Sequence, residues 1–534
     1  MRSSSADEST SGAPLLGDQQ DVENGAAAAE DPAQPAQRRK RFTCQELFWC
    51  PETGYQPGGR SAVLSTYTYA AVHGATDQLL PASFKSLEID LRLSPVGLGT
   101  ASSCSRIAHA IACPLWGLAI DCCGRRRMFA STALGWGLAS ALFFFVWMPW
   151  QVMPLMCFTG LFMAAMGPLS QKVLSEEVPA DSRGTSFGTM HFFQSLGRII
   201  SLQAATSVSG LFILGAEGWR YAFAMCGLVS IVMAICLGLR VPDSAEQKRL
   251  QKSSGVKWFS PKELLYVLWN GSFWSMLLVG ILNGIPRSAL NFCTMWFQYC
   301  GITDWWSSFI VSASWIAAMF VAPFVGCLGD YASRLSRDHG RPLVAQISLI
   351  LRSGLMAILL TCIPLQPSSF WIFLVLSVLI GFLAGWPGVG VNRPILSEIV
   401  KPQHRATVFA LVSTCEGIGA ALLGAPLVGF LSQTVFGYIS VDHSHKLVAL
   451  TDLQRQSNAR ALSRAMLCMT VGPWIANVLV YCILHKTYRK DRQLQTVFED
   501  APANAENRID AAQQDVSCGD NRPQRYKMRT AEQR

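Results

Sequence analysis

The chain has 534 residues, of which 50% are hydrophobic and only 15% are charged. This composition excludes an ordinary soluble globular protein, in which about a quarter of the residues carry charge. The formal net charge of +9 does not imply a nucleic-acid partner, because Lys and Arg that border membrane spans are the usual orientation signal. We therefore expect an integral membrane protein in contact with the lipid bilayer.

The first 57 residues are predicted to form a disordered N-terminal tail. As far as about residue 36 they hold acidic side chains among Ser, Gly and Ala, with almost nothing to bury in a core. No apolar signal region follows Met1, so we expect the first transmembrane helix to direct membrane insertion.

Twelve windows of about 20 mainly apolar residues, the length of a membrane-spanning helix, follow the tail. Six lie in the first half of the chain, at about 61–84, 97–120, 128–148, 152–173, 186–214 and 221–239. Six lie in the second half, at about 271–297, 306–328, 343–364, 370–391, 407–435 and 461–484. The predicted fold is an all-α membrane protein with two pseudo-symmetric six-helix bundles, 58–240 and 270–488, and a disordered C-terminal tail at 489–534.

The distribution of Lys and Arg predicts the orientation of the bundles. With these boundaries, the five loops on the side of the tails carry 16 Lys and Arg, whereas the six opposite loops carry 6. Loops rich in Lys and Arg stay in the cytoplasm, so both tails are expected there. The sequence leaves open which membrane holds the protein.

Residues 241–269 are predicted to be a cytoplasmic linker between the bundles. Ser260, Pro261 and Glu263 form a helix start signal, in which Ser260 caps the helix and Pro261 takes its first position. We expect a short helix lying along the membrane surface. A plain extension of the seventh span is the alternative that the sequence leaves open.

The loop between the second and third predicted spans carries a motif of small, acidic and basic residues: Gly117, Asp121, Gly124, Arg125, Arg126 and Arg127. Gly117 is expected to let two helices approach closely, and Asp121 to pair with one of the arginines. Gly124 is expected to free the backbone for a tight turn. The motif resembles the cytoplasmic loop signature of the major facilitator superfamily, whose members are transporters.

An internal repeat strengthens this resemblance. Leu174-Ser175-Glu176, followed by Arg183, recurs as Leu396-Ser397-Glu398, followed by Arg405, with the same internal spacing. A degenerate copy of the first motif also occurs in the second half, at Gly326 and Asp330. Paired copies at equivalent loops are typical of a transporter with two pseudo-symmetric bundles. The resemblance implies that all these loop residues form a cytoplasmic gate.

Within the superfamily, several segments look most similar to the Spinster-related branch and its protist relatives: Gly284-Ile-Pro286, Thr294-Met-Trp-Phe-Gln298, Glu416-Gly-Ile-Gly-Ala, Gly424-Ala-Pro-Leu-Val-Gly429 and Pro473-Trp474. This branch is implied to move lipids, chiefly lysolipids and sphingoid lipids. One departure is that Asp77 lies only four residues before Pro81, closer than the spacing expected of Spinster proteins.

Ionisable residues inside membrane spans are expensive and therefore mark candidate functional sites. At about 1.5 Å per residue, Asp77 and Arg106 reach a similar depth on neighbouring helices. His73 lies one turn from Asp77, and His109 lies three residues from Arg106. We expect these four residues to face a central cavity and to carry a coupling proton. The alternative is an Asp77–Arg106 pair that only locks two helices together.

A second set of polar residues extends this candidate pathway: Gln194, Arg198, Arg287, Arg352 and Glu416. Gln194 and Glu416 each follow a repeated arginine by eleven residues, so they are repeat equivalents. The excess of arginine over glutamate favours an anionic head group or carboxylate substrate. For Arg352, contact with backbone carbonyls or with the membrane surface is the alternative.

The function that we expect is transport of a small organic solute or lysolipid-like molecule by alternating access, coupled to a proton gradient. The sequence contains no phosphate-binding loop, nucleophile elbow or metal-spaced His/Cys set, so no enzyme activity, cofactor or metal is expected. Two alternatives stay open, a passive facilitator and a non-transporting membrane sensor or scaffold that signals through its tails.

Overall fold

The computed structural model describes residues 59–179, 183–240, 271–392, 395–396, 405–439 and 452–499. The predicted N-terminal tail and the predicted linker helix lie outside these residues. The described chain is helical apart from one short hairpin of strands β1 (Phe212–Ile213) and β2 (Ala216–Glu217).

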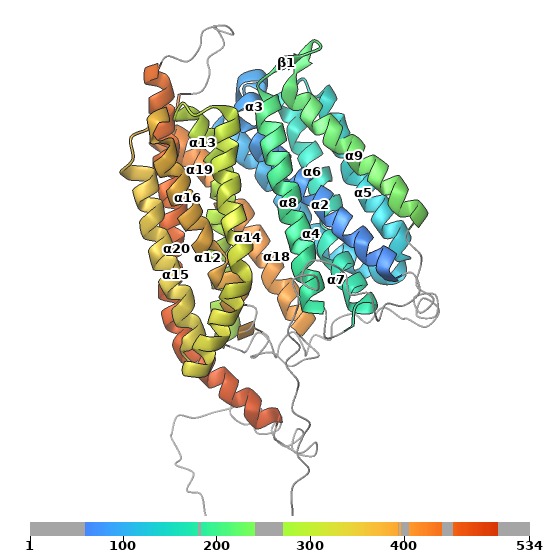
Figure 1. Ribbon diagram of the computed structural model, residues 1–534, viewed down its shortest axis with the longest axis vertical. Helices are drawn as coiled ribbons and strands as arrows, with labels where there is room; N and C mark the ends of the chain where they lie inside the picture. The colour runs from blue at the N-terminus through green and yellow to red at the C-terminus, as the bar shows by residue number, and fades with distance from the viewer. Residues whose placement is uncertain are drawn as a thin grey trace, which may run out of the picture. The chain divides into compact units, whose positions relative to one another are not determined.

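The first half contains these helices: α2 (Gly59–Ala82), α3 (Phe84–Leu91), α4 (Pro95–Cys122), α5 (Arg125–Leu142), α6 (Val152–Met163), α7 (Met166–Glu177), α8 (Arg183–Ser209) and α9 (Gly218–Arg240). α3 is a short helix that links the spans α2 and α4, and it lies at the same end of the bundle as the hairpin (Figure 1). The start of α4 follows from its sequence, because Ser94 accepts a hydrogen bond from the backbone of Gly97 at 3.3 Å and Pro95 follows it.

The second half contains these elements: α12 (Gly271–Ala289), α13 (Cys293–Tyr299), α14 (Asp304–Leu335), α15 (Gly340–Thr361), α16 (Phe370–Ala384), α18 (Arg405–Leu423), α19 (Ala425–Phe430) and α20 (Asp452–Glu499). A π-helical stretch, Trp386–Asn392, follows α16, and another, Leu431–Val435, follows α19. α20 continues past position 488, where the C-terminal tail was predicted to begin (Figure 1).

Eight helices or adjoining helix pairs in the described residues are long and apolar enough to cross a membrane. The remaining places in a twelve-span order are taken by α2, α4, α8 and α14, which have 24, 28, 27 and 32 residues. The twelve-helix prediction is therefore confirmed. Three of these four helices carry the predicted buried charges, which explains why their apolar signal is weaker.

Glycines let α2 and α8 pack backbone to backbone. A Cβ atom on Gly197 of α8 would overlap the carbonyl oxygen of Ala71, and one on Gly74 of α2 would overlap the carbonyl oxygen of Gln194. Small residues of this kind allow close contact between membrane helices. The packing fixes the faces of α2 and α8 that carry the predicted polar residues.

Two glycines of the loop motif behave differently from the prediction. A Cβ atom on Gly117 would meet nothing within 4 Å, so the expected close helix contact at this position is absent. Gly124 caps α5 with φ −64° and ψ 139°, an extended conformation that any residue adopts. Neither glycine is required by the described geometry, because the chain leaves α4 without a left-handed turn.

Candidate substrate site and gates

The central ion pair of the protein joins α2 to α8. The Arg198 guanidinium lies 3.3 Å from the Asp77 carboxylate. The Arg198 side chain is 23% exposed and the Asp77 side chain is 29% exposed. The alternative interpretation set Asp77 against Arg106, which interacts with Asp77 electrostatically but does not form this ion pair. The glycine contacts between α2 and α8 explain the difference, because they turn these helices so that Asp77 and Arg198 meet.

His73 belongs to the same face of α2 and is linked to α8 by a polar chain. Gln194 Nε2 lies 3.3 Å from His73 Nδ1, and Gln194 Oε1 lies 3.4 Å from His191 Nδ1. The ring of Trp136 contacts His73 edge-on, with 5.8 Å between ring centroids. Gln194 therefore connects a buried histidine of α2 to the exposed His191 of α8.

Arg106 and His109 of α4 complete the polar group in the first bundle. Both interact electrostatically with Asp77 and with Arg287, which comes from α12 in the second bundle. The side chain of Arg287 is exposed although it lies within a membrane span. The site therefore draws on both bundles and offers an accessible cation.

Glu416 of α18 reaches this site from the other side of α12. Its Cβ atom would lie 3.6 Å from a Cβ atom placed on Gly280, and its Cγ atom would lie 3.3 Å from one placed on Gly284. Its charge interacts with that of Arg106 in the first bundle. The packing of Glu416 on Gly284 repeats the packing of Gln194 on Gly74, as expected for repeat equivalents.

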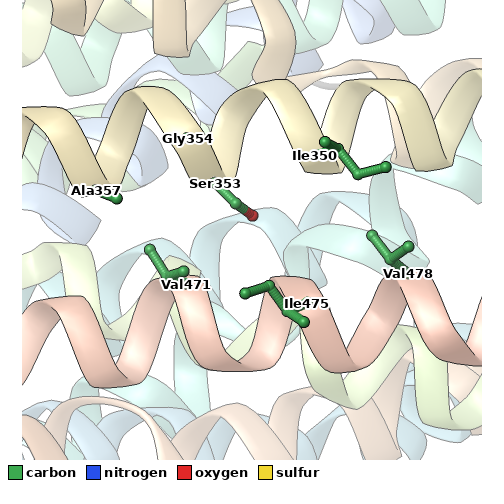
Figure 2. A pocket seen from close by; sticks show the side chains of 7 residues that line it. All are labelled: Ile350, Ser353, Gly354, Ala357, Val471, Ile475 and Val478. Carbon is green, nitrogen blue, oxygen red and sulfur yellow. The ribbon is translucent and has the colours of Figure 1, made fainter.

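Arg352 is not brought into this group. Its guanidinium lies 4.1 Å from the ring centroid of Trp474, where α15 meets α20. Beside it, α15 and α20 line a pocket of about 350 Å³ that is almost wholly apolar. Figure 2 shows its lining side chains projecting from the two helices into the space between them: Ile350, Ser353, Gly354, Ala357, Val471, Ile475 and Val478. Arg352 thus stabilises a helix pair by a cation–π contact.

On the side of the loop motif, Arg125 forms a buried ion pair with Glu177 at the end of α7, and only 4% and 7% of their side chains are exposed. The predicted gate includes Glu176, the exposed neighbour of Glu177, and its role stays a prediction. Arg126 donates a hydrogen bond to the carbonyl oxygen of Gly238, which ties α5 to α9. In the second copy, Asp330 of α14 lies 3.4 Å from Arg341 of α15.

The remaining members of the predicted cytoplasmic gate are only partly described. The side chains of Asp121, Arg183 and Arg405 and the whole of Glu398 lie outside the described residues. The structure therefore does not place them, and their roles stay predictions.

Besides Glu177, sequence reasoning missed a second buried acid, Glu88 of α3. Its carboxylate is bound by the hydroxyl groups of Tyr299 and Tyr438, which both belong to the second half of the chain. A signal was present, because Phe84, Leu87 and Leu91 place one apolar face on this short helix and Glu88 lies on that face. An acid on a buried face demands a partner.

Comparison with known families identifies the class of protein. The family model described as Major Facilitator Superfamily matches residues 66–351 and 307–441. The chain therefore belongs to the major facilitator superfamily, as the loop motifs predicted. It is a multi-pass membrane transporter and not an enzyme.

Curated relatives are similar over about two thirds of the chain. A homolog of the multi-drug resistance efflux pump PmrA from Lactococcus lactis is 24% identical, over 64% of this chain and 79% of its own length. A putative niacin/nicotinamide transporter, NiaP, from Bacillus subtilis is also 24% identical, over 65% of this chain and 82% of its own length. These relatives transport different compounds, so they define the class and not the substrate.

Among solved structures, the fold is similar to that of a bacterial homolog of the human lysosomal transporter Spinster in an inward-facing, unoccupied conformation. The TM-score is 0.68 at 15% identity, over 82% of this chain and 99% of that chain. A D-xylose–proton symporter gives a TM-score of 0.57 at 15% identity, over 77% of this chain and 96% of that chain. The fold is therefore Spinster-like.

Proposed function

We propose that this transporter moves a small organic anion, or a lysolipid-like molecule with an anionic head group, together with a proton. The observation that carries the proposal is the Asp77–Arg198 ion pair, whose two charged groups lie 3.3 Å apart and stay partly exposed. Asp77 also interacts electrostatically with cations from both bundles, Arg106 and Arg287. A charged pair inside a membrane protein needs a role beyond packing, because it is costly to bury.

The charge balance of the site favours an anion. Arg106, Arg198 and Arg287 interact electrostatically with one another, and Asp77 is the acid that all three share. Arginine binds carboxylates and phosphates through paired hydrogen bonds. Arg287 is exposed and comes from the second bundle, so an anion that binds it together with Arg198 would hold the two bundles together.

Coupling follows from competition for Arg198. An anion that binds the Arg198 guanidinium displaces the Asp77 carboxylate, which loses the partner that kept it charged. Asp77 then takes up a proton, so that one anion and one proton occupy the site together. Release of the anion restores the ion pair and expels the proton. The cavity opens alternately to each side as the bundles rock about this site.

The cytoplasmic gate in this proposal includes the Arg125–Glu177 pair and the predicted loop residues Asp121, Glu176, Arg183, Glu398 and Arg405. We place both tails in the cytoplasm because the loops on this side carry most of the Lys and Arg. We propose a monomer, since each chain contains both bundles of the transport unit.

Flux measurements in proteoliposomes test this function. Radiolabelled niacin and a radiolabelled lysophosphatidic acid serve as carboxylate and phosphate probes, with and without a pH gradient. We expect the gradient to accelerate the uptake of one probe at least tenfold, and we expect Asp77→Asn to remove that acceleration. Arg352→Lys, which changes an arginine outside the site, should keep it.

The alternatives give different results. A passive facilitator would move a probe at the same rate with and without the gradient. A sensor or scaffold would move neither probe, and its cellular phenotype would depend on residues 1–36 or 495–534 rather than on Asp77. Either result would contradict proton-coupled transport.

A further inference from the structure

A hydrogen-bonded triad joins the two bundles at the end of the protein that holds α3 and the hairpin. Glu88 of α3 contributes the acid, and Tyr299 of α13 and Tyr438, which follows the π-helical stretch Leu431–Val435, contribute hydroxyl groups. Only 1%, 1% and 5% of these residues are exposed. The triad is therefore a sealed contact between the first and second halves of the chain.

The oxygen–oxygen distances of the triad all fit hydrogen bonds. Tyr299 Oη lies 2.6 Å from Glu88 Oε2, Tyr438 Oη lies 2.7 Å from Glu88 Oε1 and 2.8 Å from Glu88 Oε2, and the two tyrosine oxygens lie 2.9 Å apart. Three pairs of residues are thus in contact, but the two phenols supply only two hydrogens. Protonated Glu88 supplies a third, so the geometry fits the neutral acid better than the carboxylate.

The second bundle holds its two tyrosines in fixed places. Asn458 of α20 is fully buried, and it accepts a hydrogen bond from the backbone N–H of Ile439 and donates one to the carbonyl oxygen of Ile439, each at 2.9 Å. The neighbouring Tyr438 is thereby positioned. On the other side, the ring of Phe84 packs against that of Phe292 with 4.9 Å between centroids. The triad thus brings α3 against the segment of the second half that runs from Phe292 to Tyr299.

We propose that Glu88, Tyr299 and Tyr438 form an outer gate that binds a proton when it closes, separately from the proton that accompanies the substrate. The inference rests on the proposed alternating-access function. It adds a second proton site, which lies on the opposite side of the membrane from the loop motifs. Protonation of this site would shift the equilibrium between the outward-open and outward-closed states.

The electrostatic surroundings agree with this role. Burial raises the pKa of the Glu88 carboxyl to about 7, while the tyrosine hydrogen bonds and the charge of Lys85 act in the opposite direction. Lys85 itself interacts electrostatically with two residues of the second bundle, Asp304 of α14 and Arg455 of α20.

The sign of the effect follows from linkage. When the gate opens, Glu88 meets water and its pKa returns to about 4.3. The closed gate therefore holds the proton more tightly, and acid on the outer side favours closure. Between pH 8.5 and pH 5.5, these two pKa values change the closed-to-open ratio roughly 30-fold.

Distance measurements between two spin labels test this inference without any substrate. Phe212 and Leu453 are 72% and 78% exposed and lie near the outer ends of the two bundles. Replacing both with a ketone-bearing amino acid allows labelling that leaves the native cysteines untouched. In nanodiscs, we expect the short-distance population to grow between pH 8.5 and pH 5.5.

Variants identify the group that responds. Glu88→Gln supplies its own amide hydrogens, so it should hold the short distance at both pH values. Tyr438→Phe removes a phenol from the triad and should lower the closed population at pH 5.5 at least fivefold. Asp90→Asn is the matched control, because Asp90 also lies on α3 but pairs with Arg220 of its own bundle at 2.9 Å. It should keep the wild-type response.

Two results would overturn the gate. One is a wild-type distance distribution that does not change between pH 5.5 and 8.5. The other is a Glu88→Gln variant whose response matches the wild type. Because no substrate is added, failure of the flux experiment would leave these results unaffected, and failure here would leave the flux experiment unaffected.

Discussion

Asp77 and Arg287 occupy equivalent positions in the two bundles. Asp77 lies three residues after Gly74, which packs on the backbone of Gln194, and Arg287 lies three residues after Gly284, which packs on the backbone of Glu416. The pseudo-symmetry of the fold therefore places an acid in one half and a base in the other at matching sites, and their charges interact.

This relationship predicts the effect of removing the accessible cation. Arg287→Gln should weaken the binding of an anionic substrate about 10- to 100-fold, because a charge-assisted hydrogen bond contributes roughly 1.5–3 kcal/mol. Thermal-shift titration with the anion that moves in the flux experiment measures this. Arg352→Lys should bind normally, and equal weakening in both variants would remove Arg287 from the site.

The contact between α2 and α8 predicts a strong effect of one added methyl group. Gly197→Ala would place its Cβ against the carbonyl oxygen of Ala71, so we expect a loss of about 1–3 kcal/mol and a lower apparent Tm in detergent. Gly188→Ala, on the same helix, meets nothing within 4 Å and should have little effect. Similar Tm values for both variants would contradict the described packing.

The Arg125–Glu177 pair predicts a difference between two adjacent glutamates. Glu177→Ala removes the buried carboxylate that pairs with the Arg125 guanidinium and should cost about 3–5 kcal/mol. Glu176→Ala changes an exposed side chain and should lower the apparent Tm much less. The reverse order would contradict the Arg125–Glu177 pair.

Glu88 predicts a pH-dependent stability. Its pKa is raised to about 7, so its contribution to the folded state is complete below the unfolded pKa of about 4.3 and is lost as the pH rises through 7. The apparent Tm should therefore fall between pH 5 and pH 8, by the equivalent of about 2–3 kcal/mol. Glu88→Gln should flatten this slope, and an unchanged slope would assign it to other groups.

The sequence was sufficient for the number of spans and for the superfamily, because span length and loop motifs are local properties. It also predicted charged residues within α2, α4 and α8, at the positions where the structure places them on these helices. It did not identify the partner of Asp77, because depth along a helix does not give the rotation of that helix about its axis. The glycine contacts that set this rotation join residues more than 100 positions apart.

The partners of Glu88 in the outer triad could not be predicted from the sequence either. Tyr299 and Tyr438 follow Glu88 by 211 and 350 positions, and no local pattern links residues so distant. The apolar face of α3 indicates that Glu88 is buried, but only the docking of the two halves reveals what binds it. For Gly117 and Gly124 the sequence predicted too much. The motif suggested a close helix contact and a tight turn, but the described backbone needs glycine at neither position.

The weak apolar character of α2, α4 and α8 has a consequence for how the protein enters the membrane. The first stretch that meets the requirement for an independent span is Arg125–Phe145, which follows both α2 and α4. A charged residue at the centre of a span costs about 2.5–3.5 kcal/mol on insertion scales. Asp77 and Arg198 lower this cost only when they pair. We therefore expect that α2, even if it directs insertion, is held less firmly in the bilayer until α8 packs against it. The residues proposed to bind substrate would then also delay the stable insertion of the first bundle.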